Sequence, residues 1–169
     1  MDRLLTMDRQ LRKIATATRA EMESFARKHT GVGFKGSDID LSCYCAIASY
    51  FLVMMGRKFG YNLSLVEGAA FDGSGDEFEY SNDEFADYDI NHCWVEHKGK
   101  IIDLSAKQFD PSLKKVHIVD VDDNEYCPIN RNNAVRKDFK ANWPNEQSPY
   151  TYIKELRERA NTLSIKIAA

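Results

Sequence analysis

The chain has 169 residues, of which 43% are hydrophobic and 29% are charged, and its formal net charge is -3. This composition is that of an ordinary soluble globular protein, and the length favours a single domain over residues 1–169. The longest apolar run, Ala46 to Met55, is too short to span a bilayer, and the N-terminal residues lack the apolar stretch of a signal peptide. We therefore expect no membrane partner and a cytoplasmic location, where thiols stay reduced.

Acidic side chains are concentrated in the middle of the chain. Residues 37–129 carry 18 acidic and 7 basic side chains, whereas both flanks carry more basic than acidic ones. Either terminal helices pack near the acidic middle and partly neutralise it, or an acidic rim attracts a cationic substrate. A nucleic-acid partner is not expected, because no basic stripe with interleaved aromatic residues occurs.

The first part of the chain is predicted to be helical. Apolar residues recur at helical spacing over 3–28, and a glycine-rich connector over 29–38 ends this helix. A second helix is expected over 41–58, with Asp40 or Ser42 as its N-cap. This second helix is apolar on nearly every side, which is typical of a buried central helix.

The rest of the chain is predicted to form strands and then helices. Strands are expected over 62–71, 91–97, 100–105, 116–121 and 125–129, and helices over 132–143 and 148–163, the last with Ser148 as N-cap and Pro149 at its first position. The segment 72–89, with eight acidic and no basic side chains, is expected to be a loop, either solvated or a flap over a cleft. The order of elements predicts an α+β fold, with a core over about 38–129 flanked by helical segments over 1–30 and 130–165.

A hairpin brings polar residues together in the predicted sheet. The two-residue turn Lys98-Gly99 sets the register of the strands on either side. Because side chains alternate along a strand, one face of the hairpin should carry His92, Trp94, Asp103 and Ser105. Asp103 is then the diagonal neighbour of His92 and can bond an imidazole nitrogen, which favours the protonated ring. Such a pair is the orienting half of a nucleophilic triad.

A cysteine at the start of the second helix could complete this triad, because the helix dipole stabilises a thiolate there. Both Cys43 and Cys45 fall in the first two turns of that helix, and the backbone amide of Cys45 would point at a developing oxyanion. Cys93 alternates to the face opposite His92 and is predicted to lie in the core, as is Cys127. No C-x-x-C pair occurs, so no structural zinc site is expected.

The segments "CAIAS…FLVMMGRKFGYNLSLVEG" and "HCWVEHKGKIIDLS" resemble the transglutaminase-like branch of the papain-like cysteine enzymes. The resemblance covers residues 41–109 and implies a buried helix that begins with the nucleophile and packs on an antiparallel sheet. It implies Cys45 as nucleophile, His92 as base and Asp103 as orienting acid, with Cys43 as the alternative nucleophile. The family includes peptidases, protein cross-linkers, deamidases, acetyltransferases and inactive members, so the resemblance implies acyl chemistry without naming a substrate.

We therefore expect a cysteine-dependent hydrolase or acyltransferase that attacks an amide bond of a peptide or protein through a thioester, with no cofactor and no metal. Residues expected to support the site are Trp94, Ser105 and Gln108. One alternative is a non-catalytic binding or inhibitory module with the same fold. A second alternative is a metal site formed by His92, His97, Asp103 and a cysteine, which is disfavoured because His97 points away from His92 by strand alternation.

Overall fold

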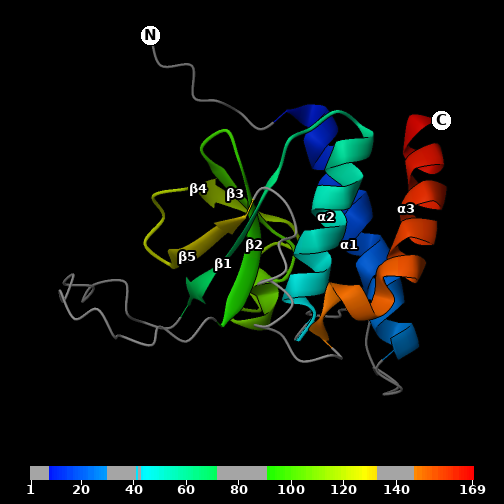
Figure 1. Ribbon diagram of the computed structural model, residues 1–169. Coiled ribbons are helices and arrows are strands. Elements are labelled where there is room, and N and C mark those ends of the chain that lie inside the picture. The colour runs from blue at the N-terminus through cyan, green and yellow to red at the C-terminus, as the bar shows by residue number, and fades with distance from the viewer. Residues whose placement is uncertain (1–7, 30–40, 42, 72–90, 133–146) are drawn as a thin grey trace, which may run out of the picture.

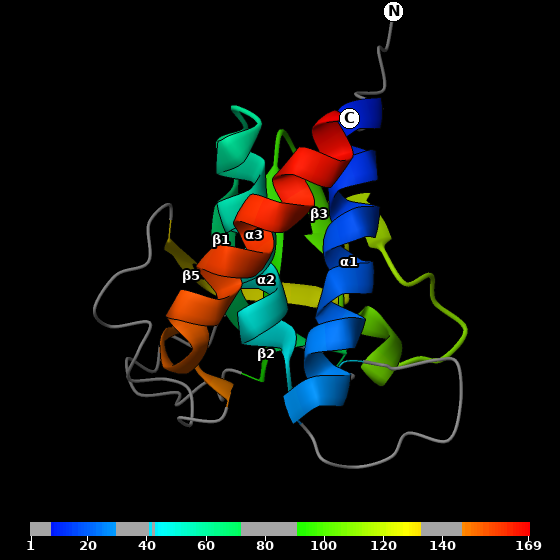
Figure 2. The ribbon, with the colours of Figure 1, turned by 90° about the vertical axis from the view of Figure 1, so that its right-hand side faces the viewer.

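The computed structural model describes residues 8–29, 41, 43–71, 91–132 and 147–169. Within these ranges the fold is α+β, with three α-helices on one side of a five-stranded antiparallel sheet (Figure 1). Helix α1 runs antiparallel to α2 and α3, and all three lie in front of the sheet in Figure 2. None of the described helices combines the length and the apolar composition needed to cross a membrane.

Helix α1 spans Arg9–His29 and begins later than predicted. The carboxylate of Asp8 accepts a hydrogen bond of 2.8 Å from the backbone N–H of Gln10, and Asp8 itself is not helical. An aspartate in this position caps a helix by satisfying one of its free N–H groups. The described helix therefore begins at Arg9, the earlier predicted residues 3–7 lie outside the described ranges, and the helix also includes His29, which was assigned to the connector.

Helix α2 spans Cys45–Lys58, four residues shorter at its start than predicted. Leu41 and Cys43 have φ values of 62° and 67°, which a right-handed helix excludes. The N-cap residue is Tyr44, which makes no side-chain cap hydrogen bond. The two expected caps, residues 40 and 42, lie outside the described residues. Cys45 is consequently the first residue of the helix, whereas Cys43 precedes it.

Five strands form the sheet in the order β4-β3-β2-β1-β5. Their bounds are Ser64–Ala70 (β1), His92–His97 (β2), Lys100–Asp103 (β3), His117–Asp120 (β4) and Tyr126–Asn132 (β5). The predicted hairpin register is confirmed, because His97 pairs with Lys100 and Val95 pairs with Ile102. Both turn residues, Lys98 and Gly99, have positive φ values, as a tight two-residue hairpin turn requires.

The sheet separates two apolar clusters. The larger one lies between the helices and the sheet, and residues such as Cys93 and Ile102 contribute to it from the strands. The smaller one consists of Val66, Ala70, Trp94, Ile101 and Tyr126. Tyr126 lies on the edge strand β5, yet its ring centroid is 5.1 Å from that of Trp94 on β2 and 6.4 Å from that of His117 on the opposite edge strand, β4. The sheet therefore curls until its two edges approach each other over the smaller cluster.

Gly68 on β1 permits this curl. A β-carbon at this position would lie 2.1 Å from the carbonyl oxygen of Cys127 and 2.7 Å from the ring of Trp94. Any side chain larger than hydrogen would therefore push β5 away from β1 and displace Trp94.

The C-terminal part differs from the prediction in three ways. Strand β5 continues to Asn132, so no helix begins there, and the rest of the expected helix over 132–143 lies outside the described residues. The last helix starts with a 3-10 turn, Pro149–Tyr152, and continues as α3, Ile153–Ala168, beyond the predicted end. Ser148 makes no side-chain cap hydrogen bond, so the predicted cap is wrong, although Pro149 does occupy the first turn as expected.

The acidic segment 72–89 and most of the predicted connector over 29–38 also lie outside the described residues.

Candidate functional site

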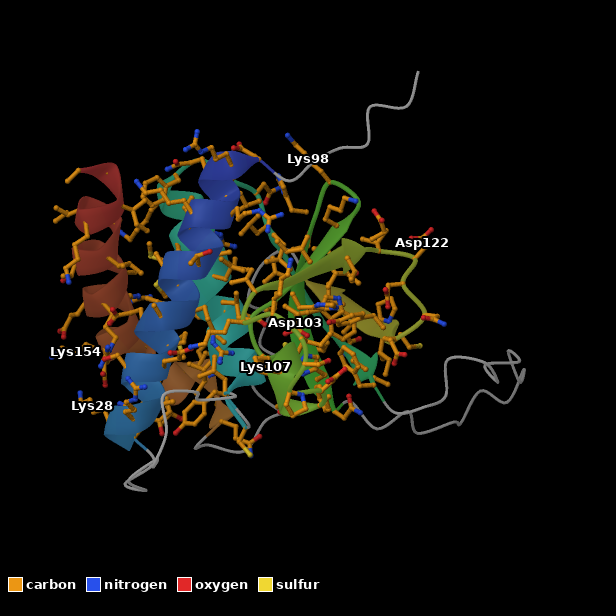
Figure 3. The ribbon with its side chains drawn as sticks, turned by 180° about the vertical axis from the view of Figure 1, so that it is seen from behind. Lys28, Lys98, Asp103, Lys107, Asp122 and Lys154 are labelled. Carbon is orange, nitrogen blue, oxygen red and sulfur yellow. The ribbon has the colours of Figure 1, made fainter. Side chains whose placement is uncertain are left out.

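Three residues selected from the sequence meet at one end of the molecule. Helix α2 and strand β2 both begin there, and β3 ends there, so their terminal residues Cys45, His92 and Asp103 converge (Figure 1). His92 and Asp103 are completely buried, and Cys45 is 3% exposed. In Figure 3, Asp103 lies in the interior of the molecule, whereas Lys98 and Asp122 project from its periphery.

His92 and Asp103 form the predicted pair. The Nε2 atom of His92 lies 2.6 Å from the Oδ2 atom of Asp103. The hairpin turn produces this contact, because its register places the two residues diagonally across β2 and β3 on the same face. Each group compensates for the burial of the other, since an unpaired carboxylate or imidazolium would be strongly destabilised at this position.

The Asp103 carboxylate has three further donors. The backbone N–H and the hydroxyl of Ser105 donate to Oδ1, over 2.8 and 3.2 Å, and the Tyr126 hydroxyl donates to Oδ2 over 2.9 Å. Burial by itself would raise the pKa of Asp103, but the charge of His92 and these hydrogen bonds outweigh it and lower the pKa below the ordinary value. The carboxylate is thus held ionised and fixed at both oxygens.

The protonation of His92 follows from the same contacts. Burial alone would lower the pKa of His92, but the charge of Asp103 and its hydrogen bond raise it to about 10, with a smaller contribution from Cys45. The Nδ1 atom of His92 is buried and has no hydrogen-bond partner in the described part of the chain. Cys45 therefore lies close enough to His92 to favour the protonated ring. Because Asp103 occupies Nε2, Nδ1 is the nitrogen that can hold the proton of the Cys45 thiol.

The remaining cysteines separate into different environments. Burial, together with the nearby Cys45, raises the pKa of the Cys93 thiol well above its ordinary value, and Cys93 is fully buried in the core as predicted. The hydroxyl of Ser49, one turn after Cys45, donates to the Cys93 carbonyl over 3.0 Å and so fastens α2 to β2. Cys127 is only half-buried, which corrects its assignment to the core, and Cys43 is exposed. All four thiols are free.

The other residues selected from the sequence have mainly supporting contacts. Trp94 is fully buried, with its ring centroid 6.0 Å from that of His92. Gln108 donates to the carbonyl oxygen of Ser105 over 3.1 Å and therefore braces the turn after Asp103. His97 lies at the other end of β2 and contacts the carbonyl of Asn62, far from the pair. Among the described residues, no group of three or more His, Cys, Asp or Glu side chains is arranged to hold a metal ion.

Two contacts at the site were missed from the sequence. Tyr126 reaches Asp103 from β5, although β1 and β2 lie between β5 and β3 in the sheet order. Phe109 follows the 3-10 turn Ala106–Gln108, and its ring centroid lies 4.9 Å from that of His92 at an interplanar angle of 88°. Neither residue carries a local sequence signal, because both contacts depend on the curl of the sheet or on the path of an irregular turn.

Comparisons with protein-family models, with curated proteins and with solved structures found no match for this chain.

The free energy of unfolding should depend on pH through His92. The folded protein holds a proton on His92 up to a pKa of about 10, whereas the unfolded chain loses it near the ordinary value of 6.5. The stabilisation is thus fully present below pH 6.5 and is lost as the pH rises through 10. In urea unfolding across this range, the free energy of unfolding should fall more steeply with pH for the wild type than for His92→Gln, which lacks the titrating ring. The contribution of Cys93 is common to both proteins and cancels in the comparison. Parallel curves would contradict the raised pKa.

The Tyr126 hydroxyl should contribute measurably to stability. Tyr126→Phe removes one donor from a buried carboxylate, which is expected to cost about 1.5–3 kcal/mol of unfolding free energy. Tyr61→Phe is a matched control, because the Tyr61 hydroxyl donates to Asp8 over 2.5 Å at an exposed site, where solvent screens the interaction, so this substitution should cost clearly less than Tyr126→Phe. Equal losses in the two variants, measured by urea unfolding at neutral pH, would show that Tyr126 does not stabilise the buried anion.

Proposed function

We propose that the protein is a cysteine-dependent hydrolase or acyltransferase that attacks an amide bond of a peptide or protein through a thioester on Cys45. One observation carries the proposal. The His92 ring has one nitrogen fixed on the buried Asp103 carboxylate and the other without a hydrogen-bond partner within the described residues, and Cys45 at the start of α2 lies near enough to help raise the pKa of this ring. We further propose that the α+β fold is a papain-like or transglutaminase-like core, on the resemblance of residues 41–109.

The proposed reaction uses these atoms in sequence. The reacting form is a Cys45 thiolate beside a His92 imidazolium that already holds the thiol proton on Nδ1, and this thiolate attacks the carbonyl carbon of the substrate. The developing oxyanion lies at the start of α2, where the first N–H groups of a helix have no acceptor within it. The His92 imidazolium then donates its proton to the leaving amine, so that a thioester remains on Cys45. Water or an amine next attacks the thioester, and His92 removes its proton.

Asp103 acts through His92 in this scheme. Its carboxylate holds Nε2, which fixes the ring orientation and stabilises the imidazolium that forms when the thiol is deprotonated. Ser105 and Tyr126 in turn hold the carboxylate, so that neither oxygen is free to rotate away. A preference for a cationic substrate stays a prediction from the acidic composition of residues 72–89.

Burial favours a second candidate function, that of a binding or inhibitory module without catalysis. His92 and Asp103 are fully buried and Cys45 is 3% exposed, so the thiol presents little surface to an amide bond in this conformation. The two candidates differ in the expected reactivity of Cys45, because a thiolate beside an imidazolium alkylates rapidly whereas a buried structural thiol is inert.

Site-mapped alkylation discriminates between them. The protein would be treated with iodoacetamide at neutral pH, and mass spectrometry would follow the modification of each cysteine with time. If the protein is the proposed enzyme, we expect Cys45 to react faster than Cys43, although Cys43 is the exposed thiol. His92→Ala should remove this advantage while Cys43 continues to react at its former rate. Rapid reaction at Cys43 and an inert Cys45 would favour the binding module.

A further inference from the structure

Two phenylalanines form an aromatic surface beside His92. The rings of Phe71 and Phe109 are stacked, with centroids 5.2 Å apart and an interplanar angle of 18°. Phe109 is 37% exposed, which makes it one of only four large hydrophobic side chains so exposed in the described ranges. Stacking on Phe71 holds the Phe109 ring in place, while part of its surface stays open to solvent.

This surface contacts one of the proposed reacting groups, His92. The Phe109 ring meets the His92 ring edge to face, at 4.9 Å between centroids and an angle of 88°. The same imidazole is bound to Asp103 through Nε2, so its position relative to Phe109 is fixed. A group that rests on Phe109 is therefore in contact with the ring that packs directly against the proposed base.

Phe71 is held in a conformation that its residue type disfavours. Its φ value is 55°, in the left-handed region that bulky side chains rarely occupy. Its N–H donates to the carbonyl of Glu125 over 3.0 Å, and its ring packs edge-on against Tyr126 at 5.3 Å. Such strain persists only where surrounding contacts impose it, and it is concentrated at functional sites. Here the imposed conformation directs the ring beneath Phe109.

We propose that Phe71 and Phe109 form a substrate-binding surface that selects an aromatic side chain next to the scissile carbonyl. This inference rests on the proposed function, since it needs an acyl group delivered to Cys45. The two rings present no hydrogen-bond donor or acceptor, so they discriminate against small polar side chains. Ring-on-ring packing adds to the burial of apolar surface and favours an aromatic occupant over an aliphatic one.

The test compares two alkylating reagents that differ only by a phenyl ring, iodoacetamide and N-phenyl-iodoacetamide. The rate constant of each would be measured at Cys45 by site-mapped mass spectrometry, with the exposed Cys43 of the same molecule as the internal reference. We expect Cys45 to prefer the phenyl reagent by about tenfold relative to Cys43, as ring packing and apolar burial together allow. Phe109→Ala should abolish this preference, and Phe109→Leu, which keeps apolar bulk, should retain part of it.

Ile129→Ala is the matched control, because Ile129 is also 37% exposed but lies on β5 beyond Tyr126. It should leave the preference unchanged. A reactive Cys45 without preference for the phenyl reagent would overturn the binding surface and leave the proposed function standing. Equal acceleration of both reagents in Phe109→Ala would also overturn it, because Phe109 would then only cover His92. An inert Cys45 beside a reactive Cys43 would overturn both proposals.

Discussion

Cys45→Ala is expected to reduce the hydrolysis of an activated ester such as p-nitrophenyl acetate to background, a loss on the order of a thousandfold or more. The sulfur atom is the only part of the scheme that forms a bond to the acyl group, so no neighbouring group replaces it. The fold should survive, because the substitution removes one atom from the first residue of α2 and leaves the helix contacts intact. The rate of p-nitrophenolate release and the circular dichroism spectrum would measure these two outcomes.

Cys43→Ala is the matched control for this prediction. Cys43 is exposed, has a positive φ value and precedes the helix, so its removal should leave the rate near that of the wild type. An inactive Cys43→Ala protein together with an active Cys45→Ala protein would reassign the nucleophile.

His92→Ala should be as inactive as Cys45→Ala, whereas Asp103→Asn should retain some activity. The imidazole must move a proton in both halves of the reaction, while the carboxylate only orients and stabilises it. We expect a loss on the order of a thousandfold or more for His92→Ala and a smaller loss, about ten- to a hundredfold, for Asp103→Asn. The same ester assay would measure both, and full activity of either variant would contradict the proposed roles.

The structure adds a stability cost to Asp103→Asn that the sequence did not indicate. The carboxylate accepts from His92, from Tyr126 and twice from Ser105, and an asparagine offers an acceptor at only one of the two oxygen positions. The amide NH₂ of the asparagine therefore faces at least one donor that is left without an acceptor, which should lower the free energy of unfolding by about 1–3 kcal/mol. The assay should be run well below the melting temperature of the variant, measured by thermal unfolding.

The His92–Asp103 contact could be predicted because it depends on local rules. The Lys98-Gly99 turn sets the register, and the alternation of side chains then places His92 and Asp103 on one face. The start of α2 could not be predicted in the same way. Leu41 and Cys43 adopt left-handed φ values that their side chains do not favour, so only the surrounding structure determines them.

Contacts at the site between residues far apart in the chain could likewise not be predicted from the sequence. Tyr126 reaches Asp103 only because the sheet curls and brings β5 over β3, and no local pattern encodes that curl. The absence of a Ser148 side-chain cap shows the same limit, because the 3-10 turn that follows places the backbone differently from an α-helical start. Pairing within one hairpin was therefore predictable, while the groups that surround the pair were not.

The most direct test of the proposed function is to trap and locate the thioester. The protein would be mixed with p-nitrophenyl acetate, quenched in acid within the first turnover, and digested for mass spectrometry at low pH, where thioesters survive. We expect one acetyl group on Cys45 that hydroxylamine removes and that is missing from His92→Ala treated in the same way. Acetyl groups on Cys43 or on lysines, with Cys45 unmodified, would contradict it.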